Sequence, residues 1–150
     1  MEEITYKGMK VYTVCRYVQY EGFTRVKRED GLYNFVDKQG DFLSDEWFIY
    51  AYDFKDDFAK VQRSDYLWNF INKYGNYLSD KWFVRVYEFI EGFVLVQRED
   101  NLYNLIDEKG NYISDEWYKD VYKVKKGYTK VQRINGDWGN IDKYGNFYKF

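Results

Sequence analysis

One stretch of this chain occurs three times at a constant spacing of 35 residues. The copies are LYNFVDKQGDFLSDEWF at residues 32–48, LWNFINKYGNYLSDKWF at 67–83 and LYNLIDEKGNYISDEWY at 102–118. A fixed period of this length is typical of proteins built from small units that bury their apolar faces against their neighbours. The repeat is therefore expected to be architecture rather than a reaction centre.

The period divides almost the whole chain into units. Three full units fit without gaps, at residues 22–56, 57–91 and 92–126, and residues 127–150 supply the first part of a fourth. Residues 10–21 match the second part, with Tyr17 at the position that Tyr52 holds in the next unit. We predict a single repeat domain over residues 1–150.

The first half of each unit has the pattern of a β-hairpin. A glycine or aspartate and an aromatic residue lead into a strand, as in GFTRVKR and DFAKVQR, and a second strand with alternating character follows. An Asp/Asn-x-x-Gly tetrapeptide then occurs four times, at residues 37–40, 72–75, 107–110 and 142–145. Asp or Asn suits the first position of a tight turn, and glycine accepts the positive φ that closes it.

The second half of each unit is less regular. A short strand at residues 42–43 leads to Ser44, which, like Ser79 and Ser114, is predicted to cap one helical turn with acids near its N-terminus. Trp47 and its equivalents then begin a last aromatic strand, such as FVRVYEF at residues 83–89. No segment carries an apolar stripe of 3.6-residue period over three turns, so the fold is predicted to be all-β.

Two all-β arrangements remain open at this point. The first is an open, twisted array of tandem β-hairpin units, and the alternative is a closed, propeller-like ring of four units in which the N-terminal piece completes the C-terminal one. Stacking places equivalent residues in columns: valine (Val26, Val61, Val96, Val131), tryptophan (Trp47, Trp82, Trp117), aromatic (Tyr33, Trp68, Tyr103, Trp138) and arginine (Arg28, Arg63, Arg98, Arg133).

These units resemble the WG-repeat family, also called KWG repeats. The fourth copy carries the dipeptide that names the family, Trp138-Gly139, followed by Ile141-Asp142, and the tail VYEFIEGFVLV at residues 86–96 also matches. The first three copies read Tyr-Asn or Trp-Asn instead of Trp-Gly. The resemblance covers about 140 of the 150 residues. It implies a β-repeat fold common in bacterial and phage-related proteins, with no shared catalytic residues.

Composition and charge exclude several classes of function. The chain has no histidine, which removes most zinc sites and every histidine-based catalytic dyad or triad, and its one cysteine excludes an internal disulfide. A net charge of −2 with mixed signs argues against nucleic acid as a partner. No window is apolar enough for a membrane span, and MEEITYKGMK lacks the apolar core of a secretory signal, so a cytoplasmic location is expected.

The arginine column beside the aromatic column is the strongest candidate for a binding site. In the functional interpretation the two columns form a groove for phosphate, nucleotide or acidic side chains. The structural interpretation, which we favour, pairs each arginine with the aspartate column (Asp45, Asp80, Asp115) or with turn carbonyls of a neighbouring unit. Asn34, Asn69 and Asn104 are expected to be inward strand residues that bond a turn rather than a ligand.

The remaining polar residues point to no chemistry. Adjacent acids at Glu29-Asp30, Asp56-Asp57, Glu99-Asp100 and Asp115-Glu116 recur with the period and lie in turns, whereas a glycosidase needs two carboxylates facing each other across a cleft. No calcium-loop pattern is present, and Cys15 has no histidine to activate it. No cofactor, metal or enzymatic activity is therefore expected.

The functional prediction is a non-enzymatic, protein-binding repeat module, an adaptor or inhibitor that presents an extended face of aromatic residues and arginine. The alternative is a small-ligand binder for carbohydrate or nucleotide that uses the same two columns. The partner is expected to be a protein, and exposed strands of the terminal units are expected to allow a homo-oligomer.

Overall fold

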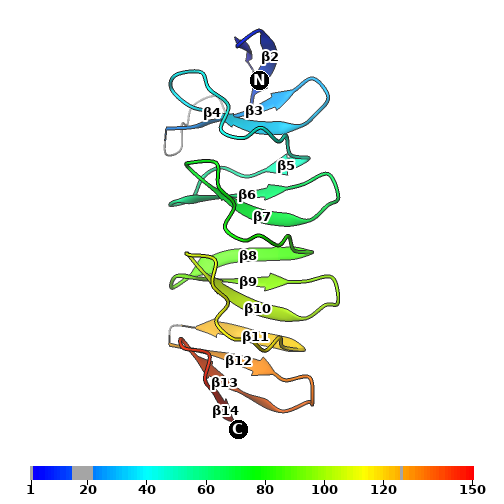
Figure 1. The fold of residues 1–150 in the computed structure, drawn as a ribbon, viewed down its shortest axis with the longest axis vertical. Helices are drawn as coiled ribbons and strands as arrows, with labels where there is room; N and C mark the ends of the chain where they lie inside the picture. The colour runs from blue at the N-terminus through cyan, green and yellow to red at the C-terminus, as the bar shows by residue number, and fades with distance from the viewer. Residues whose placement is uncertain (1, 15–21, 126) are drawn as a thin grey trace. The chain divides into compact units, whose positions relative to one another are not determined.

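The computed structural model describes residues 2–14, 22–125 and 127–150, and Cys15 and Tyr17 lie outside these ranges. The described chain is all-β, as predicted, and contains fourteen strands in four antiparallel sheets and no helix. It divides into two compact units, Met1–Asp80 and Lys81–Phe150, here called the N-terminal and C-terminal units. Each unit holds two of the sheets (Figure 1).

The N-terminal unit contains the sheets β1-β2-β3-β4 and β5-β6-β7. Their strands are β1 (Glu3–Tyr6), β2 (Met9–Thr13), β3 (Thr24–Arg28), β4 (Tyr33–Val36), β5 (Tyr50–Ala51), β6 (Phe58–Gln62) and β7 (Trp68–Asn72). The C-terminal unit contains β8-β9-β10 and β11-β12-β13-β14. Their strands are β8 (Arg85–Ile90), β9 (Phe93–Gln97), β10 (Tyr103–Asp107), β11 (Asp120–Lys125), β12 (Tyr128–Gln132), β13 (Trp138–Asp142) and β14 (Phe147–Lys149).

Each sheet is made from two sequence repeats. The last strand of one repeat pairs with the first strand of the next, so that β5, from the 22–56 repeat, lies against β6 of the 57–91 repeat. The pairs β8–β9 and β11–β12 follow the same rule. The basic sheet is therefore a three-stranded meander, and its boundaries are shifted by one strand relative to those of the 35-residue sequence repeat.

This offset also places the two partial repeats. The N-terminal strand β2 pairs with β3, and β12 and β13 of the C-terminal fragment pair with β11. Each partial repeat is thus completed by strands next to it in the sequence, and no sheet combines strands from both ends of the described chain. The tandem hairpin units are confirmed, whereas the exchange of terminal pieces that defines the closed ring is absent from these sheets.

The N-terminal strand departs from the 35-residue numbering. In the second sheet Tyr50 lies opposite Gln62, and the equivalent of Gln62 in the first sheet is Lys27. Lys27 faces Tyr12, three residues earlier than Cys15, the position that the period assigns. In the first sheet, β2 (Met9–Thr13) therefore takes the place that β5 has in the second. The predicted match of Tyr17 with Tyr52 lies outside the described residues.

The four Asp/Asn-x-x-Gly turns form as predicted. In the first, Asp37 Oδ1 accepts hydrogen bonds from the backbone N–H groups of Gln39 and Asp41, both at 2.9 Å. The N–H of Gly40 donates to the carbonyl of Asp37, and Gly40 has a φ of 84°. The same backbone bond recurs at Gly75, Gly110 and Gly145, and all three have positive φ.

One face of each sheet is the core. The valine column is fully buried, with Val26, Val61, Val96 and Val131 all at 0% exposure. Opposite Val26 in the ladder stands a buried asparagine, Asn34, and Asn69 and Asn104 take the same place beside Val61 and Val96. The side of the sheets that carries these valines and asparagines is called the valine face.

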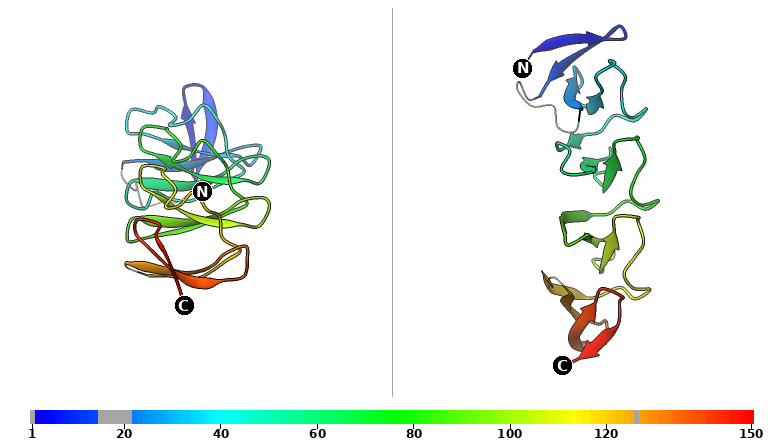
Figure 2. Two further views of the ribbon diagram at one scale, coloured as in Figure 1. Left: turned by 60° about the horizontal axis from the view of Figure 1, so that its bottom comes forward. Right: turned by 90° about the vertical axis from the view of Figure 1, so that its left-hand side faces the viewer.

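The asparagine fastens the long connection that covers the valine face. Asn34 Nδ2 donates to the carbonyl of Ser44 at 2.8 Å, and its Oδ1 accepts from the N–H of Phe35 at 2.8 Å. Asn69 with Ser79 and Asn104 with Ser114 make the same bonds. In the right-hand view of Figure 2, these connections extend to the right of the strands. The prediction of an inward asparagine that bonds a turn is confirmed.

The predicted helical turn after Ser44 does not form. Ser44 Oγ accepts a hydrogen bond from the N–H of Glu46 at 3.0 Å, but the segment is a bend. Two backbone bonds between Tyr33 and Phe48, at 2.7 and 2.9 Å, return the chain to the sheet immediately after Trp47. This leaves too few residues for a helical turn. The predicted short strand at 42–43 is likewise a single bridge, from Val36 to Phe42.

The fourth copy replaces the asparagine with Gly139, the glycine of the Trp-Gly dipeptide. The following strand, β14, pairs directly with β13. A Cβ at position 139 would collide with the carbonyl of Tyr148 and the ring of Phe147. Glycine is therefore needed for close approach of the last strand, which takes the place of the covering connection found in the other copies.

We expect Gly75→Ala to destabilise the fold more than Gly92→Ala. Both glycines have φ near 84°, so both variants carry about 1–2 kcal/mol of backbone strain. A Cβ at Gly75 would lie 2.7 Å from the carbonyl oxygen of Leu43 in the preceding repeat, whereas Gly92 has open space around it. This crowding should destabilise the Gly75→Ala variant by about 1–3 kcal/mol more. Denaturant unfolding of the two variants measures the difference. Equal losses would contradict a tight contact between neighbouring repeats.

We expect Asn69→Ala to lower the free energy of unfolding by about 2–4 kcal/mol, because the buried Ser79 carbonyl and Phe70 N–H lose their hydrogen-bond partner. The matched control is Asn76→Ala, at an exposed turn position where the effect should stay within about 0.5 kcal/mol. Denaturant unfolding of both variants measures the difference. A loss at Asn69 no larger than that at Asn76 would show that the connection is held by other contacts.

Candidate functional site

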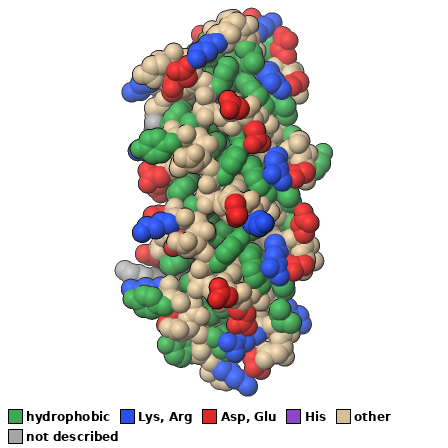
Figure 3. Space-filling model, viewed as in Figure 1, with side chains coloured by type: hydrophobic (Ala, Val, Ile, Leu, Met, Phe, Trp, Pro, Cys, Tyr) green, Lys and Arg blue, Asp and Glu red, His purple; other side chains and the backbone are tan. Residues whose placement is uncertain are grey.

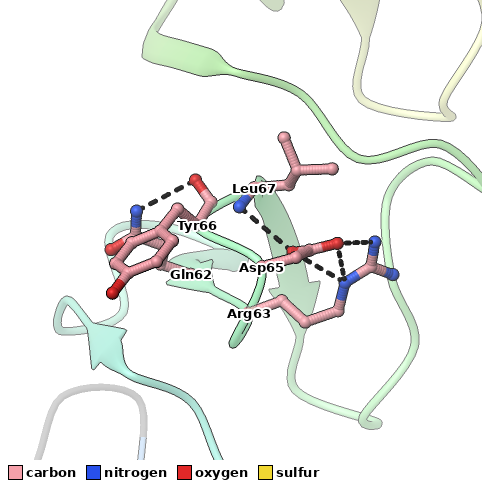
Figure 4. A network of polar contacts seen from close by, with 5 residues as sticks. All are labelled: Gln62, Arg63, Asp65, Tyr66 and Leu67. Carbon is pink, nitrogen blue, oxygen red and sulfur yellow. Dashed lines mark hydrogen bonds and ion pairs between the residues drawn. The ribbon is translucent and has the colours of Figure 1, made fainter. Parts of the chain in front are cut away.

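The arginine column is paired within its own hairpin turns. Arg28 donates from Nε and Nη2 to the two carboxylate oxygens of Asp30, at 3.0 and 2.6 Å. Arg63 makes the same two-point contact with Asp65, at 3.1 and 2.6 Å, as Figure 4 shows. Arg98 Nε lies 2.8 Å from Asp100. The partner is the aspartate two residues later, so the predicted pairing with Asp45, Asp80 and Asp115 is wrong.

Each of these aspartates has a second role in the turn. Asp65 Oδ1 also accepts a hydrogen bond from the N–H of Leu67 at 3.2 Å, and Asp30 and Asp100 do the same for Leu32 and Leu102. The arginine guanidinium holds the pKa of all three carboxyl groups below its usual range, with the backbone N–H as a smaller cause. The pair and the turn therefore support each other.

The fourth arginine shows what happens when the aspartate is missing. Position 135 is asparagine, and its Oδ1 still accepts from the N–H of Asp137 at 2.9 Å. Without an aspartate two residues after it, Arg133 lies 3.0 Å from Glu116 instead. On the face that Figure 3 shows, Lys and Arg side chains lie next to Asp and Glu side chains rather than gathering by sign.

Aromatic rings cover the guanidinium groups. The Arg28 guanidinium lies 4.6 Å from the ring centre of Trp47, Arg98 lies 4.4 Å from Trp117, and Arg133 lies 3.8 Å from Phe147. These are cation–π distances, and a guanidinium that is both paired and stacked has little capacity left for a ligand. The competing interpretation, in which the arginines are structural, is therefore the one that the geometry supports.

Two members of the tryptophan column have the same surroundings. Trp47 makes an edge contact with Phe42 at 5.1 Å and 62°, and Trp117 makes one with Tyr112 at 5.2 Å and 62°. Both also stack on the arginine of their own repeat. The recurrence of one local arrangement, predicted from the period, is confirmed for these two residues.

The aromatic column lies on the opposite side of the sheets from the arginines. Lys27 faces Tyr33 in the ladder, one residue away from the Val26–Asn34 pair on the valine face. Arg28, the next residue, stacks on Trp47, which packs against Val26. Because side chains alternate along a strand, Tyr33, Trp68, Tyr103 and Trp138 all point away from the valine face. The predicted groove between the two columns does not form.

What the structure brings together instead is a ladder of rings in the N-terminal unit. Tyr33 and Tyr50 lie 5.3 Å apart between ring centres, Tyr50 and Tyr52 4.8 Å, and Tyr52 and Trp68 5.9 Å. Tyr50 is 37% exposed and Tyr52 47%. These four residues are called the aromatic face. Such offset contacts hold the rings in place while leaving their outer sides in solvent.

Lysines lie over this ladder. Lys27 Nζ is 5.4 Å from the ring centre of Tyr33, and Lys60 Nζ is 5.2 Å from that of Tyr52. The third basic residue of this surface, Arg25, is occupied, because it donates to the carbonyl of Ala51 at 2.6 Å and lies 3.3 Å from Asp53. The aromatic face is therefore both apolar and positively charged at its margin.

The C-terminal unit has an equivalent surface. Lys130, the counterpart of Lys60, lies 4.9 Å from Tyr122, 5.3 Å from Trp138 and 5.5 Å from Phe150, measured to the ring centres. Tyr122 is 72% exposed. Burial, followed by the neighbouring Tyr87, raises the pKa of Tyr103. A lysine over an exposed tyrosine ring thus recurs in both units.

Sequence reasoning identified Tyr33, Trp68, Tyr103 and Trp138 but missed their neighbours Tyr50, Tyr52, Lys60 and Lys130. Tyr52, Tyr87 and Tyr122 recur at the period, and this was the available signal. Their place beside Trp68 or Trp138 depends on strands that come from different sequence repeats. That pairing was not visible before the offset of the sheets was known.

The described residues show no assembled metal site, since no group of three or more Cys, Asp or Glu side chains lies together among them. The acid pairs stand where predicted, in turns, as Asp30 and Asp100 illustrate. Within residues 2–14, 22–125 and 127–150, no helix has the length and apolarity to cross a membrane.

Comparison with known proteins identifies no family. No protein-family profile matches the chain, and no curated protein matches it in sequence. Among solved structures, it is similar to the computationally designed Ika4 protein, at 15% identity over 83% of this chain and 87% of that one, with a TM-score of 0.42. BamB from Moraxella catarrhalis is 12% identical over 87% of this chain and 50% of that one, with a TM-score of 0.40. HIRA(644-1017) is 9% identical over 94% of this chain and 50% of that one, also with a TM-score of 0.40.

The chain thus spans about half the length of BamB and of that part of HIRA. All three likenesses are weak, and they carry no argument about what this chain binds.

We expect Arg63→Met to return the pKa of Asp65 towards its ordinary value, because the Arg63 guanidinium is the main cause of its lowering. In the native chain this pair contributes stability above the unfolded-state pKa of about 3.9, and loses it as the pH falls through the lower folded-state pKa. NMR titration of the carboxyl carbons measures the shift. Asp30 and Asp100 serve as internal controls, since each has its own arginine, and an unchanged Asp65 pKa would contradict the assignment.

Proposed function

We propose that this chain is a non-enzymatic protein-binding repeat module whose contact surface is the aromatic face and its C-terminal counterpart. The observation that supports the proposal is the ladder Tyr33–Tyr50–Tyr52–Trp68, whose two central rings are 37% and 47% exposed. Tyrosine and tryptophan are the residues that contribute most to protein interfaces. An aromatic ring buries about 150–250 Å² when it is covered, so four neighbouring rings offer a substantial contact area.

The ladder is also suited to binding because it is held in place before a partner arrives. Each ring touches another ring or a lysine, so little side-chain freedom remains to be lost on association. Lys27 and Lys60 favour a partner that presents carboxylates beside apolar side chains. The partner that we propose is therefore a protein segment with acidic and apolar residues on one side.

The arginines take no part in this proposal. They are paired in their own turns and lie on the other side of the sheets, so the predicted binding set is reduced to its aromatic members. For the same reason, the arginines are not available to bind the phosphate of a nucleotide, so the small-ligand alternative is reduced to a carbohydrate that stacks on the rings. The test below distinguishes this alternative from protein binding.

Three further expectations stay predictions. The resemblance to WG repeats accords with the hairpin units and with the structural need for Gly139, but no comparison identifies that family. A cytoplasmic location and a homo-oligomer also stay predictions. For the homo-oligomer, the relevant feature is that β1 and β14 stand at the ends of their sheets, each with one partner strand.

The test is capture from a native lysate of the source organism by the immobilised chain. We expect the protein retained by the wild type to be lost, by at least about tenfold, with the double variant Tyr52→Ser/Tyr122→Ser, because both rings are exposed members of the proposed surface. The matched control is Tyr66→Ser/Tyr74→Ser, which removes two rings that are 72% and 75% exposed in turns outside the ladder.

Retention of the same protein by the Tyr52/Tyr122 variant would show that the aromatic face is not the contact surface. Absence of any retained protein, together with saturable quenching of tryptophan fluorescence by a glycan, would replace the proposal with the carbohydrate-binding alternative.

A further inference from the structure

The C-terminal unit contains a cavity of about 370 Å³ that the proposed function does not use. It lies between the sheet β8-β9-β10 and the sheet that begins with β11. Its walls are apolar and come from both sheets: Phe93, Leu105, Ile113, Val124 and Ile141. Leu105 and Ile141 belong to the buried core cluster of this unit.

The repeat supplies an internal reference for this cavity. The positions that match Phe93, Leu105 and Val124 in the N-terminal unit, 70 residues earlier, are Phe23, Phe35 and Phe54. There the Phe54 ring stacks on Phe23 at 5.0 Å and 21° and meets Phe35 edge-on at 5.0 Å and 68°. Phe54 is 3% exposed, so the three rings fill the space between the two sheets.

In the C-terminal unit two of these three rings are absent. Leucine replaces phenylalanine at 105 and valine replaces it at 124, while Phe93 keeps the ring on which the counterpart of Phe54 would stack. Both smaller residues line the same cavity, so part of the space that the rings fill in the N-terminal unit is empty here. An apolar cavity of about 150 Å³ already admits benzene in other proteins.

We propose that this cavity is a binding site for a small planar aromatic molecule, whose ring stacks on Phe93 in the place that the Phe54 ring takes in the N-terminal unit. The ligand completes a packing arrangement that the sequence leaves unfilled in this unit. Apolar walls supply the affinity, because binding removes the ring and the cavity lining from water.

The mouth of the cavity favours an anionic substituent on the ring. Lys125 and Lys143 stand there, each with its ammonium group near a tyrosine ring, at 5.6 Å from Tyr128 and 5.2 Å from Tyr144. Of the two acids at the mouth, Asp142 is directed to its own turn, where it accepts from the N–H groups of Tyr144 and Asn146, both at 2.9 Å. Glu91 is the other acid.

The test uses 1-anilinonaphthalene-8-sulfonate, an aromatic anion whose fluorescence rises when it leaves water. We expect saturable binding to the wild type with one site per chain. Val124→Phe restores the side chain of the N-terminal unit and should weaken binding at least about tenfold, because the new ring occupies the ligand's place. Leu105→Phe fills the cavity from the other sheet and should do the same.

The matched control is Ile134→Phe, which makes a similar exchange at a turn position that is 65% exposed and should leave binding unchanged. Near-ultraviolet circular dichroism and thermal unfolding confirm that each variant is folded. Both filled variants should unfold at or above the wild-type temperature, since a ring added to an empty apolar space adds contacts.

Three results would overturn the proposal. The first is an absence of saturable binding by the wild type, and the second is wild-type affinity in both filled variants, which would place the probe elsewhere. The third is a loss of folding in both filled variants, because a ring that the cavity accommodates does not disrupt the core. Since none of these variants lies on the aromatic face, failure here leaves the protein-binding proposal intact.

Discussion

The buried asparagine on the second strand of each repeat is the contact on which the rest of the structure depends. A three-stranded meander leaves its valine face open to solvent unless something covers it, and 35 residues provide no helix to do so. Asn34, Asn69 and Asn104 each fasten the following connection across that face by donating to a serine carbonyl, and Asn34 and Asn69 also accept from the N–H of the same serine. The free energy gained by burying the valines therefore depends on polar bonds made inside the core.

Covering one face in this way determines what the other face can do. Arg28 and Arg98, at the margin of the valine side, each pair with the aspartate two residues later and stack on Trp47 and Trp117. They therefore stabilise their own repeat rather than form a binding site. The opposite side carries buried rings such as Phe35 as well as the tyrosines, tryptophans and lysines of the aromatic face. The alternation of side chains thus places the structural arginines and the surface proposed for recognition on different sides of one sheet.

Differences between the copies are as informative as their similarity. At the end of the chain Gly139 replaces the asparagine, and the last strand approaches where a covering connection would lie. At two positions of the C-terminal unit, Leu105 and Val124 replace phenylalanine and leave a cavity where the N-terminal unit is filled. An exact repeat would have the same core throughout, so each departure marks a place where the local packing differs.

The sequence alone determined what depends on neighbouring residues: the all-β class, the four glycine turns, the buried valines and the inward asparagines, because turn chemistry and strand alternation act over a few positions. Only the tertiary structure decided that sheets combine two sequence repeats, that Arg28 pairs with Asp30, and that Tyr52 lies beside Trp68. The face on which Tyr33 points follows from the register across its hairpin, and a slip of one residue would have reversed it. Register is set by the whole sheet and its cover, which no single repeat contains.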